Sequence, residues 1–278
     1  MNKTLQKLID FDALFAAYLN EWYKKKRAGG ADYASIEEAA GGVYAEWADI
    51  PLPEAGGLSA RQYFENIRDP KELVSTLIKY TAADISPPDL LAERIARDPE
   101  CGWYLFEIAR MGDSVELAVF AVNILSENGY SGLTDLLLGY LSGEKGGELA
   151  DLAVEKLTES VGEAAPALLA RLGAGGLSET AEKNIADVLV YANKDERIFR
   201  LLLRLFKEDE DAALYASYLG KYGDGRALPA LLEYGGRQDI NYMQFIETRN
   251  AVETLGGTLE NGKDFTGDPY YKALKGTE

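Results

Sequence analysis

Apolar residues recur at steps of three and four along most of the chain, which is the spacing of one face of an α-helix. Residues 4–27 show this pattern first, and the segment ends in four consecutive cations, Lys24 to Arg27, followed by two glycines at 29 and 30. Positive charge and then glycine are typical of a helix C-terminus. No segment alternates with a period of two for long enough to require a β-strand. The pattern therefore predicts an all-α fold.

Several helix starts are marked by side chains that can accept a hydrogen bond from the free N–H groups of a first turn. The candidate capping boxes are pairs three residues apart: Ser35 with Glu38, Ser59 with Gln62, and Ser86 with Asp89. Asp69 before Pro70 is a similar start, because proline suits the first helical position. These pairs predict helices that begin directly after Ser35, Ser59, Asp69 and Ser86.

Beyond about residue 100 the helical pattern repeats. The leucines that end five similar segments stand 30 to 36 residues apart: Leu125, Leu157, Leu189, Leu219 and Leu255. A second set of anchors lies between them: LLGY (137–140), LLAR (168–171), LLLR (201–204) and LLEY (231–234). Each period therefore holds two helices joined by a short turn. Helical hairpins of this kind stack to share a continuous core, which predicts an α-solenoid.

The last full period resembles a known family. The stretch LGKYGDGRALPALLEY (219–234), followed by ETRNAVETLGG (247–257), resembles a bacterial HEAT-like repeat, and the period near 32 is similar to the short, phycobilisome-lyase type. The resemblance covers residues 101–257 and is weaker in 115–141 and 179–206, which lack the Gly-Asp turn. It implies an α-α superhelix, a right-handed HEAT-like solenoid whose second helices line the concave face. Such repeats mostly form binding surfaces.

Three regions follow from the period. Residues 1–100 are helical in pattern but lie outside the repeat, and we expect a cap on the solenoid or a small separate domain. Residues 101–257 are expected to hold the HEAT-like repeats. Residues 258–278 contain Gly, Thr, Asp and Asn with two tyrosines, and are expected to form a tail or an end cap.

Composition narrows the chemistry. The chain of 278 residues has 29 Lys and Arg against 46 Asp and Glu, a net charge of −17, and no histidine. Histidine is the usual general base and a common metal ligand, so its absence excludes Ser-His-Asp and Cys-His sites and most zinc sites. The acidic balance opposes binding to nucleic-acid backbones. We expect a protein that is not an enzyme and that holds no cofactor and no metal.

The location of the protein is predicted from what the sequence does not contain. No apolar run approaches the ~20 residues that span a bilayer, and the first residues lack the pattern of a signal peptide. The single cysteine, Cys101, cannot form a disulfide within the chain and is expected to be a small buried side chain. These features predict a cytoplasmic protein with no membrane contact. They leave the oligomeric state open.

Two runs of charge have simpler explanations than ligand binding. The cations Lys24 to Arg27 follow Trp22 and Tyr23, an interleaving found in nucleic-acid binders. Four cations at a helix end, however, also complement the helix dipole. The acidic run 208–211 lacks the spaced ligands and central glycine of an EF-hand. We expect both runs to be solvated surface.

One set of side chains is a candidate binding surface, called here the ladder. It is formed by the last residue of each second anchor: Tyr140, Arg171, Arg204 and Tyr234. In the last period the apolar stripe is expected at Leu228, Leu231 and Leu232, which places Tyr234 on the flank of its helix. Tyr and Arg are the residue types that most often anchor protein interfaces. Alternatively, the four side chains fill the seams between repeats, with the Arg heads paired to acids.

The leading hypothesis is a non-enzymatic scaffold that binds an unidentified protein or peptide along the concave face. The resemblance suggests two alternatives. One is a HEAT-like DNA alkylation-repair glycosylase, which uses a carboxylate but needs a basic groove, whereas residues 101–278 carry 17 basic and 29 acidic side chains. The other is a lyase or chaperone of a tetrapyrrole-carrying protein, which rests on the name of the repeat type alone.

Overall fold

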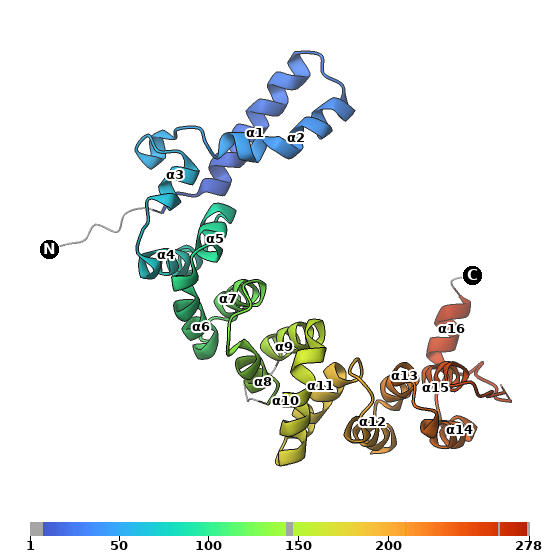
Figure 1. Cartoon of the computed structure of the whole chain (residues 1–278). Helices are drawn as coiled ribbons and strands as arrows, with labels where there is room; N and C mark the ends of the chain where they lie inside the picture. Colours follow the sequence, from blue (N-terminus) through green and yellow to red (C-terminus); the bar gives the residue numbers. More distant parts are fainter. Residues whose placement is uncertain (1–7, 143–146, 209, 261, 277–278) are drawn as a thin grey trace. The chain divides into compact units, whose positions relative to one another are not determined.

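The computed structural model describes residues 8–142, 147–208, 210–260 and 262–276. Over these ranges the chain is helical and has no strand beyond an isolated bridge between Pro51 and Ser59, so the all-α prediction is confirmed (Figure 1). Contacts along the backbone divide the chain into two compact units, residues 1–133 and 134–278.

The first unit extends further along the chain than the predicted N-terminal region. Helix α6 packs against both α4 and α7, so the division between units lies after Leu133 rather than near residue 100. The helices of this unit are α1 (Phe11–Ala28), α2 (Tyr33–Trp47), α3 (Ala60–Glu65), α4 (Pro70–Ala82), α5 (Asp89–Ala96), α6 (Gly102–Met111) and α7 (Val115–Glu127), with 3₁₀ turns η1 (Pro53–Ala55) and η2 (Pro99–Cys101).

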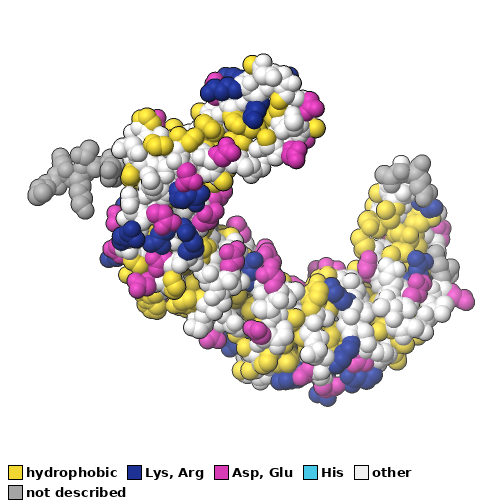
Figure 2. Space-filling model, turned by 45° about the horizontal axis from the view of Figure 1, so that its top comes forward, with side chains coloured by type: hydrophobic (Ala, Val, Ile, Leu, Met, Phe, Trp, Pro, Cys, Tyr) yellow, Lys and Arg dark blue, Asp and Glu magenta, His cyan; other side chains and the backbone are white. Residues whose placement is uncertain are grey.

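Helices α1 and α2 form a hairpin (Figure 1). Phe15 packs on Trp47 within the hairpin, and Phe11 packs on Phe64 of α3, with ring centroids 5.2 and 5.1 Å apart. Figure 2 shows hydrophobic and basic side chains close together on this hairpin. The predicted helix over 4–27 begins only at Phe11, because Asp10 caps it by accepting the N–H of Ala13 at 2.9 Å. Residues 4–7 of that prediction lie outside the described residues.

Two of the predicted helix starts are confirmed. Ser59 Oγ accepts the N–H of Gln62 at 3.2 Å, and the Gln62 side chain accepts the N–H of Ser59 at 3.1 Å, a complete capping box. Asp69 accepts the N–H of Lys71 at 2.9 Å and Pro70 is the first residue of α4.

The other two predicted starts are wrong. Helix α2 begins three residues before the expected position, because Asp32 caps it and accepts the N–H of Ser35 at 2.8 Å. Helix α5 begins at Asp89 and has no side-chain cap. Pro87 and Pro88 keep the residues before them out of the helical conformation, so Ser86 cannot start a helix.

In the second unit every predicted anchor lies in its own helix except Leu255, which directly follows the last residue of α15. Its elements are α8 (Leu133–Ser142), which starts at the boundary, α9 (Glu148–Glu159), α10 (Val161–Ala174), α11 (Glu179–Leu189), α12 (Glu196–Glu208), α13 (Ala212–Tyr222), η3 (Gly225–Ala227), α14 (Leu228–Gly236), α15 (Tyr242–Thr254) and α16 (Pro269–Lys275). Contacts α9–α11 and α13–α15 run along one row, and α10, α12 and α14 pack beside it (Figure 1). A right-handed superhelix remains a prediction.

The repeat leucines form the core of these helices. Leu157, Leu189 and Leu219 are buried. In α14, Leu231 is fully buried but Leu232 is 39% exposed, so its predicted place in the stripe is wrong. Gly235 takes that place instead, because the side chain of Leu259 packs directly over it. The buried stripe of α14 therefore follows positions i and i+4 from Leu231.

The last residues pack as an end cap of the second unit. Phe265 is buried with Ile240 and Phe245 in one cluster. Asp268 accepts the N–H groups of Tyr270 and Tyr271 and so begins α16, and it also accepts the N–H of Tyr242 at 3.0 Å.

The structure also bears on the expected burial of Cys101 and on the expected lack of a membrane-spanning helix. Cys101 is buried, and this burial raises the pKa of its thiol to about 11. None of the helices in the described ranges has both the length and the apolar character that crossing a membrane requires.

Candidate binding surface

The ladder residues lie on the four helices that hold the second set of anchors, but they do not form one exposed row. Tyr140 is in α8, Arg171 in α10, Arg204 in α12 and Tyr234 in α14. Arg171 and Arg204 are exposed, Tyr234 is half-buried, and Tyr140 is buried.

Tyr140 differs from the expected flank position because the apolar stripe of α8 has a different phase. In α8, Leu137, Tyr140 and Leu141 are all buried, which makes the tyrosine part of the stripe itself. Burial also raises the pKa of the Tyr140 hydroxyl. Its ring is therefore a core side chain and offers no surface to a ligand.

Arg204 is held by acids of its own unit. Its guanidinium donates to Glu182 of α11 at 2.6 Å and lies 3.7 Å from Glu208, one turn further along α12. The pair with Glu182 joins two helices and is one of the seam contacts that the alternative interpretation of the ladder predicts. Together with Glu179 and Leu205, these side chains line a hollow of about 280 Å³.

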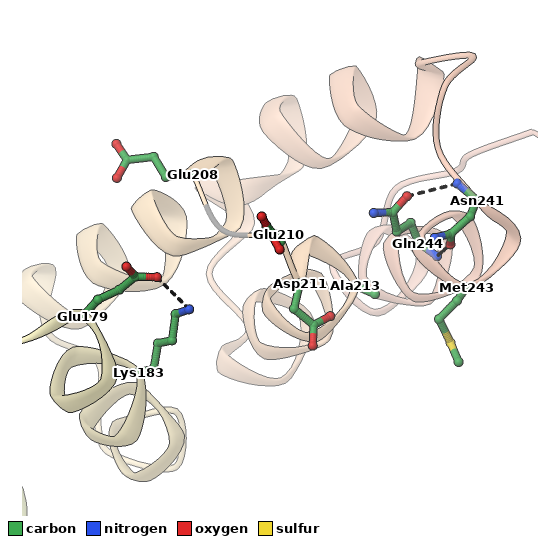
Figure 3. A pocket seen from close by; sticks show the side chains of 9 residues that line it. All are labelled: Glu179, Lys183, Glu208, Glu210, Asp211, Ala213, Asn241, Met243 and Gln244. Atoms are coloured by element: carbon green, nitrogen blue, oxygen red, sulfur yellow. Dashed lines mark hydrogen bonds and ion pairs between the residues drawn. The ribbon is translucent and has the colours of Figure 1, made fainter. Parts of the chain in front are cut away.

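A larger hollow adjoins it and shares Glu179 and Glu208. Its volume is about 650 Å³, and it lies where α11, α13 and α15 begin (Figure 3). The lining residues come from three places along the chain: Glu179, Lys183, Glu208, Glu210, Asp211, Ala213, Asn241, Met243 and Gln244.

The lining of the larger hollow is mostly acidic. Four carboxylates face one ammonium group, and Lys183 is paired with Glu179 at 2.8 Å. The positive ends of the helix dipoles help to hold this negative charge. Glu210 forms no ion pair with any residue that the structure describes; Asp209, part of the predicted solvated acidic run, lies outside those residues. The hollow therefore favours cationic groups.

Two polar side chains in the hollow are fixed by a capping box. Gln244 donates its N–H to Asn241 Oδ1 at 2.9 Å, and Asn241 donates its N–H to Gln244 Oε1 at 3.0 Å. Asp211 likewise accepts the N–H of Leu214 at 3.3 Å as the cap of α13. These bonds hold the polar rim in a defined position, which lowers the entropy that a ligand would have to remove.

Tyr234 lines a separate, smaller hollow of about 260 Å³ between α12 and α14. Its ring meets Phe206 edge-on at 5.0 Å, and the Arg237 guanidinium lies 5.1 Å from its centroid. Two of the four ladder residues, Arg204 and Tyr234, thus border hollows of the second unit.

The turn with Asp224 and Arg226, whose pair resembles the structural Asp and Arg pair of HEAT-like turns, has a counterpart at Asp195 and Arg197 that the sequence interpretation missed. Asp195 and Asp224 each accept the N–H of an arginine two residues later and also hold its guanidinium, at 2.8 and 2.7 Å. Arg226 also reaches Glu196 of the preceding turn at 2.8 Å. The hydrogen bonds from Arg197 lower the pKa of Asp195 to about 2. The signal was present as Asp-x-Arg at 195–197 and 224–226.

A half-buried carboxylate that links α11 and α13 was also missed. Tyr218 of α13 donates its hydroxyl to Asp187 of α11 at 3.0 Å. Burial raises the pKa of Asp187; the hydrogen bond from Tyr218 opposes this and Asp151 adds to it. The pair links successive helices, and no hollow opens beside it among those described above.

No group of three or more Cys, Asp or Glu side chains within the described ranges is arranged to hold a metal ion. Comparisons of the whole chain with models of known families, with curated proteins and with solved structures give no match. The HEAT-like resemblance and the function that it implies therefore stay proposals.

Proposed function

We propose that this chain is a non-enzymatic, cytoplasmic scaffold of HEAT-like repeats that binds a protein or peptide segment rich in Lys and Arg. The observation that carries the proposal is the acidic hollow of about 650 Å³ at the beginnings of α11, α13 and α15. It adjoins the hollow of Arg204, so the second unit offers a continuous acidic surface across several helices.

The chemistry of the lining fits such a segment. The carboxylates of Glu208 and Glu210 supply acceptors for an ammonium or guanidinium group. Ala213 and Met243 offer apolar contact to the aliphatic stem that carries the charge. The side chains of Asn241 and Gln244 are already oriented and can bond to a peptide backbone.

The test is fluorescence anisotropy with a short labelled peptide in which Lys and Ser alternate, against one in which Glu and Ser alternate. We expect binding of the basic peptide only, weaker at higher salt because screening shortens the range of the attraction. Glu208→Lys with Glu210→Lys should weaken binding by about tenfold or more, since attraction is replaced by repulsion at the centre of the site.

The matched control is Glu159→Lys with Glu163→Lys, which makes the same charge change at exposed positions of the α9–α10 turn. A general effect of net charge would weaken binding equally in both double variants, and equal loss would contradict a site in the hollow. Absence of binding by either peptide would contradict the proposed partner chemistry. Salt-sensitive binding of a DNA duplex would instead favour the glycosylase alternative.

The role of Arg204 gives a sharper test. In this proposal Arg204 neutralises Glu182 and Glu208 in the free protein and competes with an incoming cation. Arg204→Ala should therefore tighten binding of the basic peptide. If Arg204 is instead a contact residue of the ladder, the same substitution should weaken binding of the partner.

A further inference from the structure

The first unit contains a hollow of about 360 Å³, whereas the acidic hollow belongs to the second unit. It lies where α5 ends, α6 begins and α7 ends, and is called here the α5–α7 hollow. Sites of this volume that have mostly apolar walls and a few fixed polar groups typically bind small organic molecules.

The inner walls of the α5–α7 hollow are apolar. Ile95, Leu105 and Leu125 line it and are each only 1% exposed, so the hollow reaches the core of the first unit. Ile124 and Pro99 add further apolar surface. A ligand with an apolar body would leave water on contact with these walls, which favours its binding.

One wall is the ring of Tyr130, and a glycine makes room for it. A Cβ atom at Gly102 would lie 2.9 Å from Cε2 of Tyr130, closer than two carbon atoms pack. Phe106 packs against the same ring, with centroids 5.6 Å apart. These contacts hold the ring in position, so this wall is formed before a ligand binds.

Polar side chains at the hollow donate their hydrogen bonds within the chain. The Asn128 side chain donates to the Ala96 carbonyl at 2.9 Å and so ties the end of α7 to the end of α5. The Arg97 guanidinium donates to the Glu93 carbonyl at 3.3 Å and also to the Glu65 carboxylate. These groups are therefore poor donors to a ligand.

The backbone donors at the beginning of α6 are bonded as well. The N–H of Cys101 donates to the Asp98 carbonyl at 3.0 Å, and that of Gly102 donates to the Pro99 carbonyl. Both bonds lie within η2 and its caps, and they reduce the attraction that a helix beginning would offer to an anion.

The hollow offers a ligand acceptors instead. The carbonyl oxygens of Ala96 and Leu125 each accept a hydrogen bond at 2.9 Å, and a carbonyl oxygen can accept a second one. The Asp98 carboxylate accepts from Arg94 at 3.0 Å and likewise keeps lone pairs. Two helices, α5 and α7, end at the hollow, and the C-terminal end of a helix dipole favours positive charge.

We propose that the α5–α7 hollow binds a small organic ammonium ion that carries an apolar ring or chain. The apolar body packs on Ile95, Leu105 and Leu125, and the ammonium group donates to the acceptors at the ends of α5 and α7. This site is independent of the acidic hollow, because it lies in the other unit and buried apolar walls supply most of its contact surface.

The first test is a titration of the full chain with three probes, followed by saturation-transfer NMR. Phenethylammonium, phenethyl alcohol and phenylacetate carry the same ring and differ in the charge of the head group. We expect a Kd on the order of 1 mM for the ammonium ion. The alcohol should bind about threefold more weakly and the anion more weakly still. Equal affinities overturn the ligand class, and absence of binding by the ammonium ion overturns the site.

A variant that fills the hollow tests the location. Ala96→Leu places a larger side chain in the lining and should weaken binding of phenethylammonium about tenfold or more. The matched control is Ala92→Leu, half-buried one turn earlier on α5 and outside the lining of the hollow. Equal loss in both variants, or no loss with Ala96→Leu, overturns the site.

The glycine gives a second variant. Gly102→Ala displaces the ring of Tyr130 and should also weaken binding of phenethylammonium, whereas alanine is the better helix former. Thermal melts show that each variant is folded before it is titrated. Unchanged affinity in folded Gly102→Ala contradicts the role of the Tyr130 wall.

The acidic hollow must be separated from this site, because it also favours cationic groups. Glu208→Lys with Glu210→Lys changes only the second unit and should leave the affinity for phenethylammonium unchanged. Loss of binding in this double variant would place the ammonium ion in the acidic hollow and overturn the α5–α7 site. The basic peptide does not enter this test, so the two sites succeed or fail separately.

Discussion

The α1–α2 hairpin and the helices α11 to α15 use the same residue types in opposite ways. In the helices α11 to α15, called here the array, charged side chains join neighbouring elements, as Arg204 does with Glu182 and Arg226 with Glu196. In the hairpin, the cations of the last turn of α1 find no acid among the described residues, and a broad apolar stripe stays half-covered. The array thus pairs charged side chains between helices and has hollows at helix ends, whereas α1 of the hairpin has a stripe of half-buried apolar side chains.

The largest effect on stability is expected where a glycine lets two helices of the array approach closely. Gly220 of α13 is buried, and a Cβ atom there would lie 2.8 Å from the Cα atom of Ala251 in α15. Gly220→Ala must push two helices apart, and we expect it to lower the free energy of unfolding by about 2–3 kcal/mol. Urea unfolding measures this, and an unchanged midpoint would contradict the close approach of α13 and α15.

The turn at Asp195, which is bonded to Tyr222 of α13, should contribute less to the free energy of unfolding. The buried Tyr222 hydroxyl accepts the N–H of Asp195 at 2.6 Å and donates to its carbonyl at 3.2 Å. Tyr222→Phe removes both bonds and should cost about 1 kcal/mol. Tyr33→Phe in the hairpin is the control, because Tyr33 is 80% exposed and its loss of a hydroxyl should change nothing. Equal effects of both substitutions would show that the turn adds no stability.

Removing the half-buried charge of Asp187 should raise the stability of the protein near neutral pH. Because burial raises the pKa of Asp187 in the folded chain, ionising it costs free energy on folding above that pKa. Asp187→Asn keeps an acceptor for Tyr218 and should stabilise the protein at pH 7, by less than about 1 kcal/mol because water screens this half-buried carboxylate. The gain should disappear as the pH falls to the usual range of aspartic acid, where the unfolded carboxyl is protonated too.

Thermal melts over a series of pH values show whether Asp187→Asn stabilises or destabilises the protein. Destabilisation by Asp187→Asn at pH 7 would mean that the hydrogen bond from Tyr218 outweighs burial. Asp113→Asn, at an exposed position before α7, serves as the comparison and should have little effect at any pH.

The smallest change in the free energy of unfolding is expected in the hairpin, and it should be a gain where Gly220→Ala gives a loss. Gly42 lies inside α2, and a Cβ atom there would meet nothing within 4 Å. Gly42→Ala should raise the free energy of unfolding by about 0.5–1 kcal/mol through helix propensity alone. A loss of stability would show that a close contact of α2 is missing from this account.

Local sequence rules predicted the elements that depend on neighbouring residues. The helical period placed every anchor except Leu255 in a helix. The Ser59–Gln62 cap formed because both partners stand on one short segment. Ser35 failed as a cap because Asp32, three residues earlier, is a strong competitor. Ser86 failed because the prolines after it restrict the backbone.

The ladder and the acidic hollow could not be predicted from the sequence period, because they depend on how the helices pack. Tyr140 and Tyr234 stand at equivalent sequence positions, yet one is buried and the other borders a hollow, because the apolar stripes of α8 and α14 differ in phase. The acidic hollow joins residues from three separate segments, such as Glu179, Glu210 and Gln244. The turn at Asp195 could have been found from the sequence, because it repeats the Asp-x-Arg motif of Asp224 and Arg226.

The central claim is that the acidic hollow of the second unit receives a basic segment. Hydrogen exchange of the full chain, read by mass spectrometry with and without the alternating Lys and Ser peptide, tests it most directly. We expect the peptide to slow exchange at the beginnings of α11, α13 and α15. Exchange in the α1–α2 hairpin should not change. Protection confined to the hairpin, or binding without protection at those three helix starts, would contradict the account.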